Sequence, residues 1–271
     1  MTQPETTQPE TTLPELAQTR YEVDERGVAT ATFDRPERHN VMNPAFMEDL
    51  HRVAEHVEAG GVRALVLTGA GESFCAGGDL GWMKSQLDLT HAERVANSGD
   101  LATLLRRLDT LPTLTIARVN GQAFGGGVGM IAVCDMAFAV PTARFALTEV
   151  TLGLSPSNIS PYVVRRMGAA NARRTFLNAR MMDAAMAADL GLLTAVVDDL
   201  DAAIETEIAA VLRCGPDAVA ATKELIEFVD THDHEANAAY TARHLADAWE
   251  RAEGQEGIAA FLEKRPPAWR A

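Results

Sequence analysis

A unit made of an apolar strand, a glycine-rich loop and a helix occurs twice in this sequence, and it constrains the fold more than any other feature. In the first unit the apolar residues 63–68 run into the loop residues 75–79, with the sequence CAGGD. In the second unit the apolar residues 113–119 run into residues 124–127, with the sequence FGGG. Near-continuous apolar strands are typical of parallel sheets that are covered on both faces. Strands that alternate with helices in this way predict an α/β fold.

Other segments fit the same α/β pattern. Residues 28–33, VATATF, alternate as a strand, and Asn43 with Pro44 offers a cap and a first-turn proline to an amphipathic helix. Two short strands are expected after the second glycine loop, at residues 136–140 and 143–149. We therefore expect strands and helices to alternate through most of the chain.

The two ends of the chain differ from this middle part. The sequence TQPET occurs twice in succession at the N-terminus, with no apolar periodicity, so residues 1–18 are predicted to form a disordered tail. Beyond Gly153 the pattern becomes mostly helical. We expect a core at residues 19–199, which would hold the site, and a helical C-terminal region at residues 200–271 whose long helices pack on a partner subunit.

Composition and charge exclude several classes of protein. With 271 residues, of which 47% are hydrophobic and 23% charged, the chain is long enough for one sizeable core. The net charge of -14 argues against nucleic-acid binding through a broad basic face. No apolar stretch approaches the roughly 20 residues of a membrane span, and the N-terminus has no signal-peptide pattern. We expect a soluble, cytoplasmic protein without membrane or nucleic-acid partners.

No metal site or disulfide framework is predicted. Cys75, Cys134 and Cys214 show no CxxC spacing and are expected to be reduced, partly buried thiols. His232 and His234 are two residues apart, which places them on different faces of a helix. The chain has no HExxH or GxSxG motif, so zinc-protease and serine-hydrolase chemistry have no support.

The two glycine loops are the best candidates for a functional site. Backbone N–H groups at the start of a helix have no intrahelical partner, so they can bind a developing negative charge. A tight turn is the commoner explanation for any one such loop, but two matched loops favour a site. GGGVGM lacks the third glycine of GxGxxG, and GK[ST] is absent, so a cradle for nucleotide phosphates is the weaker interpretation.

Several segments resemble the crotonase superfamily, also called the enoyl-CoA hydratase/isomerase superfamily. FCAGGDL, followed along the chain by VNGQAFGGGVGMIAVCDMAFA, resembles the two signature segments of that family. Four more segments add to the resemblance in the right order: FDRPERHNVMN, RFALTEVTLGLSP, DAAMAADLGLLTAVV and EGIAAFLEKRPPAW. The resemblance therefore covers nearly everything after the tail.

The resemblance implies a crotonase-like spiral of ββα units with a helical C-terminal trimerisation region. It also implies a homotrimer, or a dimer of trimers, that binds an acyl-CoA thioester, with coenzyme A as part of the substrate and no separate cofactor. The N–H groups of Gly78 and Gly126 would form an oxyanion hole that stabilises an enolate. The residues placed along the coenzyme would be Ala76, Gly77, Asp79 and Leu80, with Arg38 and either Lys264 or Arg265 near its phosphates.

One position departs from the pattern of the family's hydratases. Those enzymes use two glutamates: one matches Glu149, and the other follows the second glycine loop, where this chain has Gly129. Hydration requires one group to deprotonate water and one to protonate C2. Either Glu149 does both, or the reaction is the movement of a double bond, which needs one proton shuttle. The apolar neighbours Phe145, Leu147 and Val150 would raise the pKa of Glu149 if it is buried.

The segment after Glu149 bears on the substrate. Residues 152–168, LGLSPSNISPYVVRRMG, resemble a run in bacterial hydratases that act on branched, carboxylated substrates such as 3-methylglutaconyl-CoA and isohexenylglutaconyl-CoA. Arg165 or Arg166 would then meet a distal carboxylate, although an outward-facing arginine on a helix is the commoner case. The pocket candidates are Gly129, Ser157, Asn158, Ser160 and Tyr162.

Three functions compete at this point. The first is hydration of a branched or carboxylated 2-enoyl-CoA, the second is isomerisation of a 3-enoyl-CoA to a 2-enoyl-CoA, and the third is a noncatalytic CoA-binding homologue. The presence of Glu149 with both oxyanion glycines disfavours the third. Gly129 favours the isomerase and residues 152–168 favour the hydratase, which we prefer because that segment spans more residues.

Overall fold

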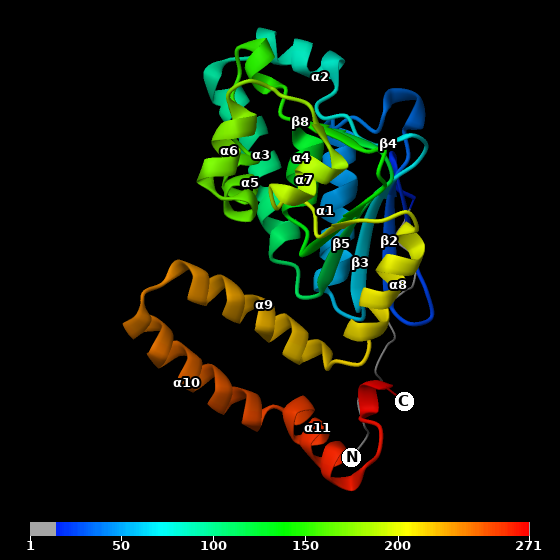
Figure 1. The fold of residues 1–271 in the computed structure, drawn as a ribbon, viewed down its shortest axis with the longest axis vertical. Coiled ribbons are helices and arrows are strands. Elements are labelled where there is room, and N and C mark those ends of the chain that lie inside the picture. The colour runs from blue at the N-terminus through cyan, green and yellow to red at the C-terminus, as the bar shows by residue number, and fades with distance from the viewer. Residues whose placement is uncertain (1–14, 271) are drawn as a thin grey trace.

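Two sheets form the centre of the molecule (Figure 1). The structure is a computed structural model that describes residues 15–270. The larger sheet has the strand order β1-β2-β3-β5-β7-β10, and the smaller has the order β4-β6-β8-β9. The strands are β1 (Thr19–Val23), β2 (Val28–Phe33), β3 (Ala64–Gly69), β4 (Ser73–Cys75), β5 (Leu114–Val119), β6 (Gln122–Phe124), β7 (Met136–Ala139), β8 (Arg144–Ala146), β9 (Met182–Asp183) and β10 (Ala195–Val196).

Helices fill the connections between strands and then make up the C-terminal part of the chain. The α-helices are α1 (Pro44–Glu58), α2 (Leu80–Ser85), α3 (His91–Asp109), α4 (Gly126–Ala132), α5 (Ser160–Met167), α6 (Ala169–Phe176), α7 (Ala184–Asp189), α8 (Leu200–Val211), α9 (Pro216–Thr231), α10 (His234–Glu250) and α11 (Ala252–Glu263). Single 3-10 turns occur at η1 (Pro36–Arg38), η2 (Gln86–Asp88), η3 (Glu149–Leu152) and η4 (Ala268–Arg270).

The chain winds as a spiral in which each turn gives one strand to each sheet. The pairs β3 and β4, β5 and β6, and β7 and β8 are consecutive in sequence, yet the first member of each pair joins the larger sheet and the second joins the smaller. The strands β3, β5 and β7 run parallel to one another, and so do β4, β6 and β8. The ββα spiral expected from the sequence is confirmed.

The predicted elements of the core form for the predicted reasons. Every residue of β3 is buried, as its continuous apolar sequence indicates for a strand covered on both faces. The side chain of Asn43 accepts a hydrogen bond from Phe46 N–H at 3.0 Å and so caps α1, while Pro44 occupies the first turn. The apolar face of α1 then packs into the main hydrophobic cluster.

Helix α8 begins at Leu200, where the helical C-terminal region is expected to start, and it packs on the larger sheet. Leu200, Ile204 and Ile208 on α8 pack with Val66 and Ile116 of the larger sheet in a second hydrophobic cluster. The backbone of α8 lies closest to β5 and β7 of that sheet. The sequence did not indicate this packing, because the pattern of an amphipathic helix does not reveal which surface the helix covers.

Ordered backbone starts earlier than the predicted tail allows. Residues 1–14 of that tail lie outside the described residues. The N–H groups of Ala17 and Gln18 donate to the two carboxylate oxygens of Asp49 at 3.0 and 2.6 Å, and Asp49 is buried on α1. The segment just before β1 is therefore held by a buried carboxylate, and the predicted limit at residue 18 is too late.

The last three long helices, α9, α10 and α11, form an arm below the sheets (Figure 1). The helices α9 and α10 are joined by stacked rings, since the Phe228 ring lies 3.7 Å from that of Tyr240 and 3.8 Å from that of His232. The predicted helical C-terminal region is thus present: it starts with α8 on the larger sheet and continues into the arm. Within residues 15–270, none of the helices has the length and apolar character that a membrane crossing requires.

Candidate active site

Three neighbouring parallel strands bring the predicted catalytic residues to one edge of the smaller sheet. Cys75 at the end of β4 pairs with Ala123 of β6, and Phe124 of β6 pairs with Ala146 at the end of β8. Each strand then leads within three residues to a predicted catalytic position, which are Gly78, Gly126 and Glu149 respectively. Because the strands are parallel and adjacent, their carboxyl ends place these residues together.

The first glycine loop is held by Met42 from the segment before α1. Met42 N–H donates to Gly77 C=O at 2.7 Å, and Asp79 N–H donates to Met42 C=O at 2.8 Å. These two bonds form a parallel bridge between Met42 and Gly78. In such a bridge the N–H of the paired residue points to the opposite side, so Gly78 N–H is directed away from Met42.

The two glycine loops touch at positions where only glycine fits. Gly77 has a φ of +90°, and a Cβ built on it would lie 2.8 Å from Phe124 C=O and 3.7 Å from Gly126 N. A Cβ on Gly127 would lie 2.2 Å from the carbonyl oxygen of Cys75. Glycine at these positions therefore allows one backbone to approach the other.

The second loop opens α4 with a backbone N–H that has no acceptor within the helix. Gly125 precedes the helix with a φ of +48°, and its C=O accepts from Val128 N–H at 2.9 Å and from Gly129 N–H at 3.3 Å. Gly126 is the first residue of α4, so its N–H has no intrahelical acceptor. Gly78 and Gly126 can thus offer two backbone donors from touching loops, which is the arrangement that binds an oxyanion.

Glu149 lies directly beside the second loop. A Cβ built on Gly125 would lie 3.0 Å from Glu149 Oε1, and Oε2 is buried with no hydrogen-bond partner among the described residues. Burial raises the pKa of Glu149, and only the backbone N–H of the same residue opposes this shift. The direction agrees with the prediction from the apolar flank, of which Phe145 and Leu147 are fully buried. A carboxyl with a raised pKa suits a group that accepts and returns a proton.

Comparison with known proteins identifies the family to which this arrangement corresponds. The sequence model of the family described as enoyl-CoA hydratase/isomerase matches residues 24–271. The chain belongs to the enoyl-CoA hydratase/isomerase family. The protein named enoyl-CoA hydratase ACTT6 of Alternaria alternata is 36% identical over 250 residues, which cover 89% of this chain and 80% of the relative.

Solved structures of similar sequence share the fold. The crystal structure of an enoyl-CoA hydratase from Shewanella pealeana superimposes with a TM-score of 0.91 at 37% identity, over 94% of this chain and 97% of that chain. Pseudomonas aeruginosa AtuE gives a TM-score of 0.89 at 38% identity, over 94% of this chain and 100% of that chain. The predicted fold class and the prediction of an enzyme of this family are confirmed.

The side chains near the first loop are partly engaged in holding the fold. Asp79 caps α2 by accepting from Gly81 N–H at 2.7 Å and Trp82 N–H at 3.2 Å. Burial alone would raise the pKa of Asp79, but these two N–H groups and the nearby charges of Arg38 and Arg35 outweigh it, so the pKa is lowered. A contact of Asp79 with coenzyme would therefore come from its backbone, because its carboxylate is already occupied.

The other residues predicted to contact the coenzyme near the first loop differ in their exposure and in their hydrogen bonds. Ala76 N–H donates to His39 C=O at 2.9 Å, so this backbone donor is already used within the protein. Leu80 is 76% exposed at the start of α2, and Arg38 is an exposed cation 4.0 Å from the Asp79 carboxylate. These positions stay predictions for the coenzyme site, and the structure groups them around one loop.

Lys264 does not lie near the glycine loops of its own chain. It ends α11 with a φ of +57°, and α11 lies at the opposite end of the molecule from α2 (Figure 1). The alternative, Arg265, is held by the carboxylates of Glu256 and Glu263 at 2.6 and 2.7 Å. A contact of Lys264 with the coenzyme phosphates would therefore require a second copy of the chain.

The predicted pocket residues after Glu149 contact one another and neighbouring helices. Ser157 Oγ lies 2.7 Å from Ser155 Oγ, and Asn158 Nδ2 donates to Ser98 C=O on α3 at 3.1 Å. Ser160 Oγ donates to Ser157 C=O at 2.8 Å, whereas Tyr162 is buried beneath the Arg165 guanidinium. Their role in a substrate pocket stays a prediction.

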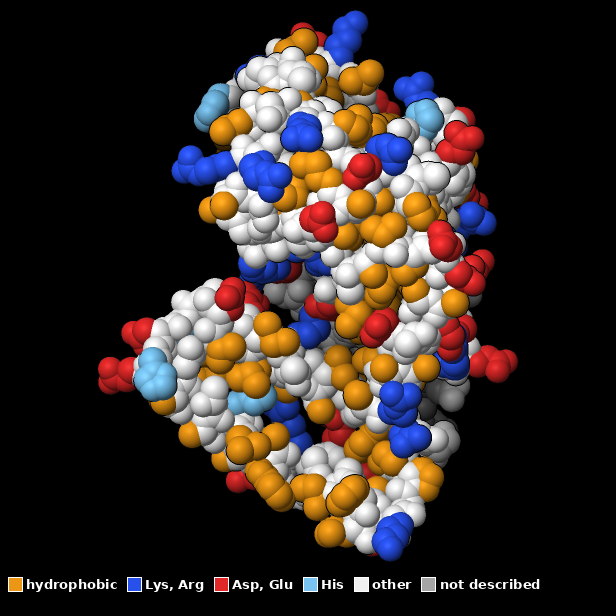
Figure 2. Space-filling view, in the orientation of Figure 1, with side chains coloured by type: hydrophobic (Ala, Val, Ile, Leu, Met, Phe, Trp, Pro, Cys, Tyr) orange, Lys and Arg blue, Asp and Glu red, His pale blue; other side chains and the backbone are white. Residues whose placement is uncertain are grey.

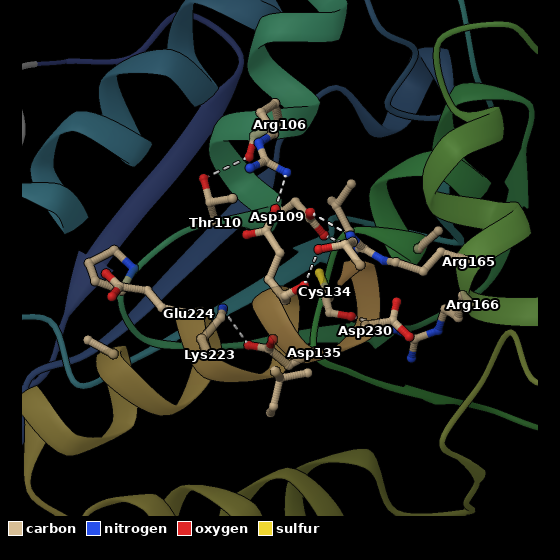
Figure 3. Close-up of a pocket in the computed structure, with 17 residues that line it drawn as sticks. Arg106, Asp109, Thr110, Cys134, Asp135, Arg165, Arg166, Lys223, Glu224 and Asp230 are labelled. Atoms are coloured by element: carbon tan, nitrogen blue, oxygen red, sulfur yellow. Dashed lines mark hydrogen bonds and ion pairs between the residues drawn. The ribbon is translucent and has the colours of Figure 1, made fainter. Parts of the chain in front are cut away.

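The two arginines proposed for a distal carboxylate are engaged elsewhere. A cavity of about 480 Å³ lies between α9 and the ends of α3, α4 and α5. Both arginines line it (Figure 3). Arg165 forms a two-bond ion pair with Asp109, and Arg166 donates to the carbonyl oxygens of Leu192 and Cys134. Cys134 follows the C-terminal end of α4, so this cavity lies a helix length from Gly126. The expectation that Arg165 or Arg166 meets a distal carboxylate of the substrate is corrected accordingly.

Both buried cysteines lie in surroundings that disfavour the reactive thiolate form. Burial raises the pKa of Cys75 and of Cys134 to about 12, whereas Cys214 is exposed. No group of three or more His, Cys, Asp or Glu side chains within residues 15–270 is placed to hold a metal ion.

Sequence reasoning missed two residues that approach the site. Met42 Sδ would lie 2.6 Å from a Cβ on Gly126, and Met83 Sδ would lie 3.3 Å from a Cβ on Gly78. The two thioethers therefore border the two proposed oxyanion donors. Met42 belongs to the family-like segment FDRPERHNVMN, which is the signal that could have identified it, whereas nothing in the sequence singled out Met83.

Proposed function

We propose that this protein is an enoyl-CoA hydratase in which one carboxylate, Glu149, carries out both proton transfers. The observation that supports this most directly is that three adjacent parallel strands bring Gly78, Gly126 and the half-buried Glu149 to one edge. The relative from Alternaria alternata and the structural neighbour from Shewanella pealeana are both named enoyl-CoA hydratases. The substrate is an acyl-CoA thioester, and no separate cofactor is proposed.

The two N–H groups would bind the thioester oxygen. When water adds at C3, the electron pair of the double bond moves toward the thioester, and negative charge collects on its oxygen. Donors that already point at this position stabilise the enolate, and a single donor of this kind contributes about 3 kcal/mol. The close contact of the two loops keeps Gly78 and Gly126 in fixed relative positions.

Glu149 would move one proton through the reaction. Its carboxylate takes a proton from water as the water oxygen forms a bond to C3, and the resulting acid then gives that proton to C2. Charge and atoms balance, since water adds across the bond and Glu149 returns to its starting state. Because both transfers use one carboxyl group, water and proton would add to the same face of the substrate.

We propose a branched or carboxylated acyl chain as the substrate class, with 3-methylglutaconyl-CoA as the test compound. The support is the resemblance of residues 152–168 to hydratases of that class. Since Arg165 and Arg166 are engaged at the far end of α4, a distal carboxylate would be met by polar groups such as Ser157 and Asn158.

A second candidate is a 3-enoyl-CoA to 2-enoyl-CoA isomerase. Ile159 packs against Gly129, so the space beside the position of the second glutamate in the family's hydratases is filled by an apolar side chain. A single base can take a proton from C2 of a 3-enoyl thioester and return it at C4, which requires no bound water. In this reaction the oxyanion donors and Glu149 would keep the same roles.

A small substrate panel distinguishes the two functions. We would follow the ultraviolet absorbance of the conjugated enoyl thioester with crotonyl-CoA, 3-methylglutaconyl-CoA and 3-hexenoyl-CoA. A hydratase lowers the absorbance of the first two, and an isomerase raises that of the third. Both signals should disappear in Glu149→Gln and persist in Glu48→Gln, an exposed change on α1. If the wild type changes none of the three, the protein is not an enoyl-CoA enzyme of this kind.

A further inference from the structure

Gly129 packs directly against Ile159, from the segment that leads into α5. A Cβ built on Gly129 would lie 2.1 Å from Ile159 Cγ2 and 2.8 Å from Ile159 Cβ. Ile159 is only 3% exposed and Gly129 is buried, so neither residue can move aside without opening the packed core. The space beside Gly129 is therefore already filled, and any side chain at position 129 requires Ile159 to leave it.

Ile159 and Glu149 approach the same stretch of α4. Gly129 N–H donates to Gly125 C=O at 3.3 Å, so the two glycines are one helical turn apart, about 5.4 Å along the axis. A Cβ on Gly125 would meet Glu149 Oε1, whereas a Cβ on Gly129 would meet the Ile159 methyl group. The carboxyl group and the isoleucine side chain thus approach two positions at the start of α4 that are joined by one backbone hydrogen bond.

We propose that Ile159 is a positioning residue of this site: it fills the place where a second acid would stand and shields Glu149 from water. The proposal rests on the proposed function and deepens it, because it explains why one carboxylate must serve. Gly129 and Ile159 form a matched pair, in which glycine is required because isoleucine occupies the space. By excluding water, the apolar side chain of Ile159 disfavours the charged form of Glu149, so the carboxyl group holds a proton at higher pH.

Charged neighbours do not account for the raised pKa of Glu149. Among the described residues, burial is the largest influence on its carboxyl, and no charged side chain contributes a resolved effect. The α4 residues beside it are glycines, and the charged residues of α5, Arg165 and Arg166, bind partners at the other end of that helix. Apolar cover is therefore the property that a change at Ile159 alters.

The pH dependence of the reaction tests the shielding role. The rate falls at low pH when Glu149 is protonated, so Ile159→Ala, which admits water, should shift this acidic limb of kcat/KM to lower pH. Ile159→Val keeps the Cγ2 that faces Gly129 and should leave the limb in place. Val163→Ala is the matched control, because Val163 is fully buried one turn further along α5. An unmoved limb in Ile159→Ala, or an equal shift in Val163→Ala, would overturn the proposal.

A stability cycle tests the packing role without any turnover. Gly129→Glu should lower the unfolding midpoint strongly, Ile159→Gly should lower it too, and the double variant should lose clearly less than the sum of the two. If the losses of the two single variants simply add in the double variant, residues 129 and 159 do not compete for the same space, and the proposal is contradicted. A failure of the proposed function can be told apart from this outcome. In that case the wild type would not alter the absorbance of any enoyl-CoA substrate, while the unfolding midpoints would still show coupling between residues 129 and 159.

Discussion

Glu149 has one carboxylate oxygen beside Gly125 and the other buried without a partner among the described residues, and burial raises its pKa. A carboxyl of this kind binds its proton more tightly in the folded protein than in the unfolded chain. Its ionisation therefore opposes folding as the pH rises. The catalytic environment of Glu149 thus reduces stability at neutral pH.

We expect Glu149→Gln to gain stability relative to the wild type as the pH rises. The difference should begin above the unfolded-state pKa of roughly 4.3, grow until the pH passes the raised folded-state pKa, and then stay constant. Urea unfolding of both proteins across this range measures it, with Glu48→Gln as an exposed control. A difference that does not change with pH would show that the carboxyl is not perturbed in the folded state.

Gly77 is predicted to be irreplaceable, in contrast to Gly99. Gly77→Ala places a side chain at a φ of +90° and 2.8 Å from the backbone oxygen of Phe124, so the loop must shift. We expect a loss of more than about 1 kcal/mol in unfolding free energy, together with loss of activity. Gly99→Ala meets nothing within 4 Å on α3 and should gain roughly 0.5–1 kcal/mol. Equal behaviour of the two variants in thermal unfolding would contradict this account of the loop.

At the scale of elements, the placement of α8 with the core has a direct test. Ile204→Ala removes a buried side chain from the cluster between α8 and the larger sheet, and should cost about 2–5 kcal/mol. Thr206→Ala, on the exposed side of the same helix, should change stability by less than about 0.5 kcal/mol. Denaturant unfolding compares the two, and a small effect of Ile204→Ala would mean that α8 does not contribute to the core.

Sequence patterns predicted the long elements better than the contacts between them. Apolar runs predicted β2, β3 and β5, and the Asn43 cap predicted the start of α1, because local periodicity and capping determine these features. The three-residue strands β4 and β6 are too short for any periodicity, yet they align the two glycine loops. The packing of Ile159 on Gly129 joins residues far apart in sequence, so no local pattern could indicate it.

At the scale of the whole molecule, the arm presents large apolar side chains. On α11, Phe261 is 82% and Leu262 is 73% exposed, and Figure 2 shows hydrophobic side chains gathered over the arm. Apolar patches of this kind mark interaction surfaces. We propose that a second copy of the chain covers them, as a homotrimer or a dimer of trimers. This assembly would also explain why Lys264 lies far from its own glycine loops, which a single sequence could not show.

Sedimentation velocity tests the assembly. The wild type should sediment as a trimer or hexamer, and Phe261→Asp combined with Leu262→Asp should shift it toward smaller species because charges would enter the apolar interface. Thr206→Asp, on the exposed side of α8, is the control and should leave the assembly unchanged. A wild type that stays monomeric at all concentrations would contradict the proposed interface.

The most direct test of the single-carboxylate account is kcat/KM for an enoyl-CoA substrate in the wild type and in Glu149→Gln, with binding of a saturated acyl-CoA measured in parallel. We predict a fall in kcat/KM on the order of 10²–10⁴ with the affinity for the saturated ligand retained, because the oxyanion donors of Gly78 and Gly126 stay in place. A variant as active as the wild type would show that Glu149 does not move the proton.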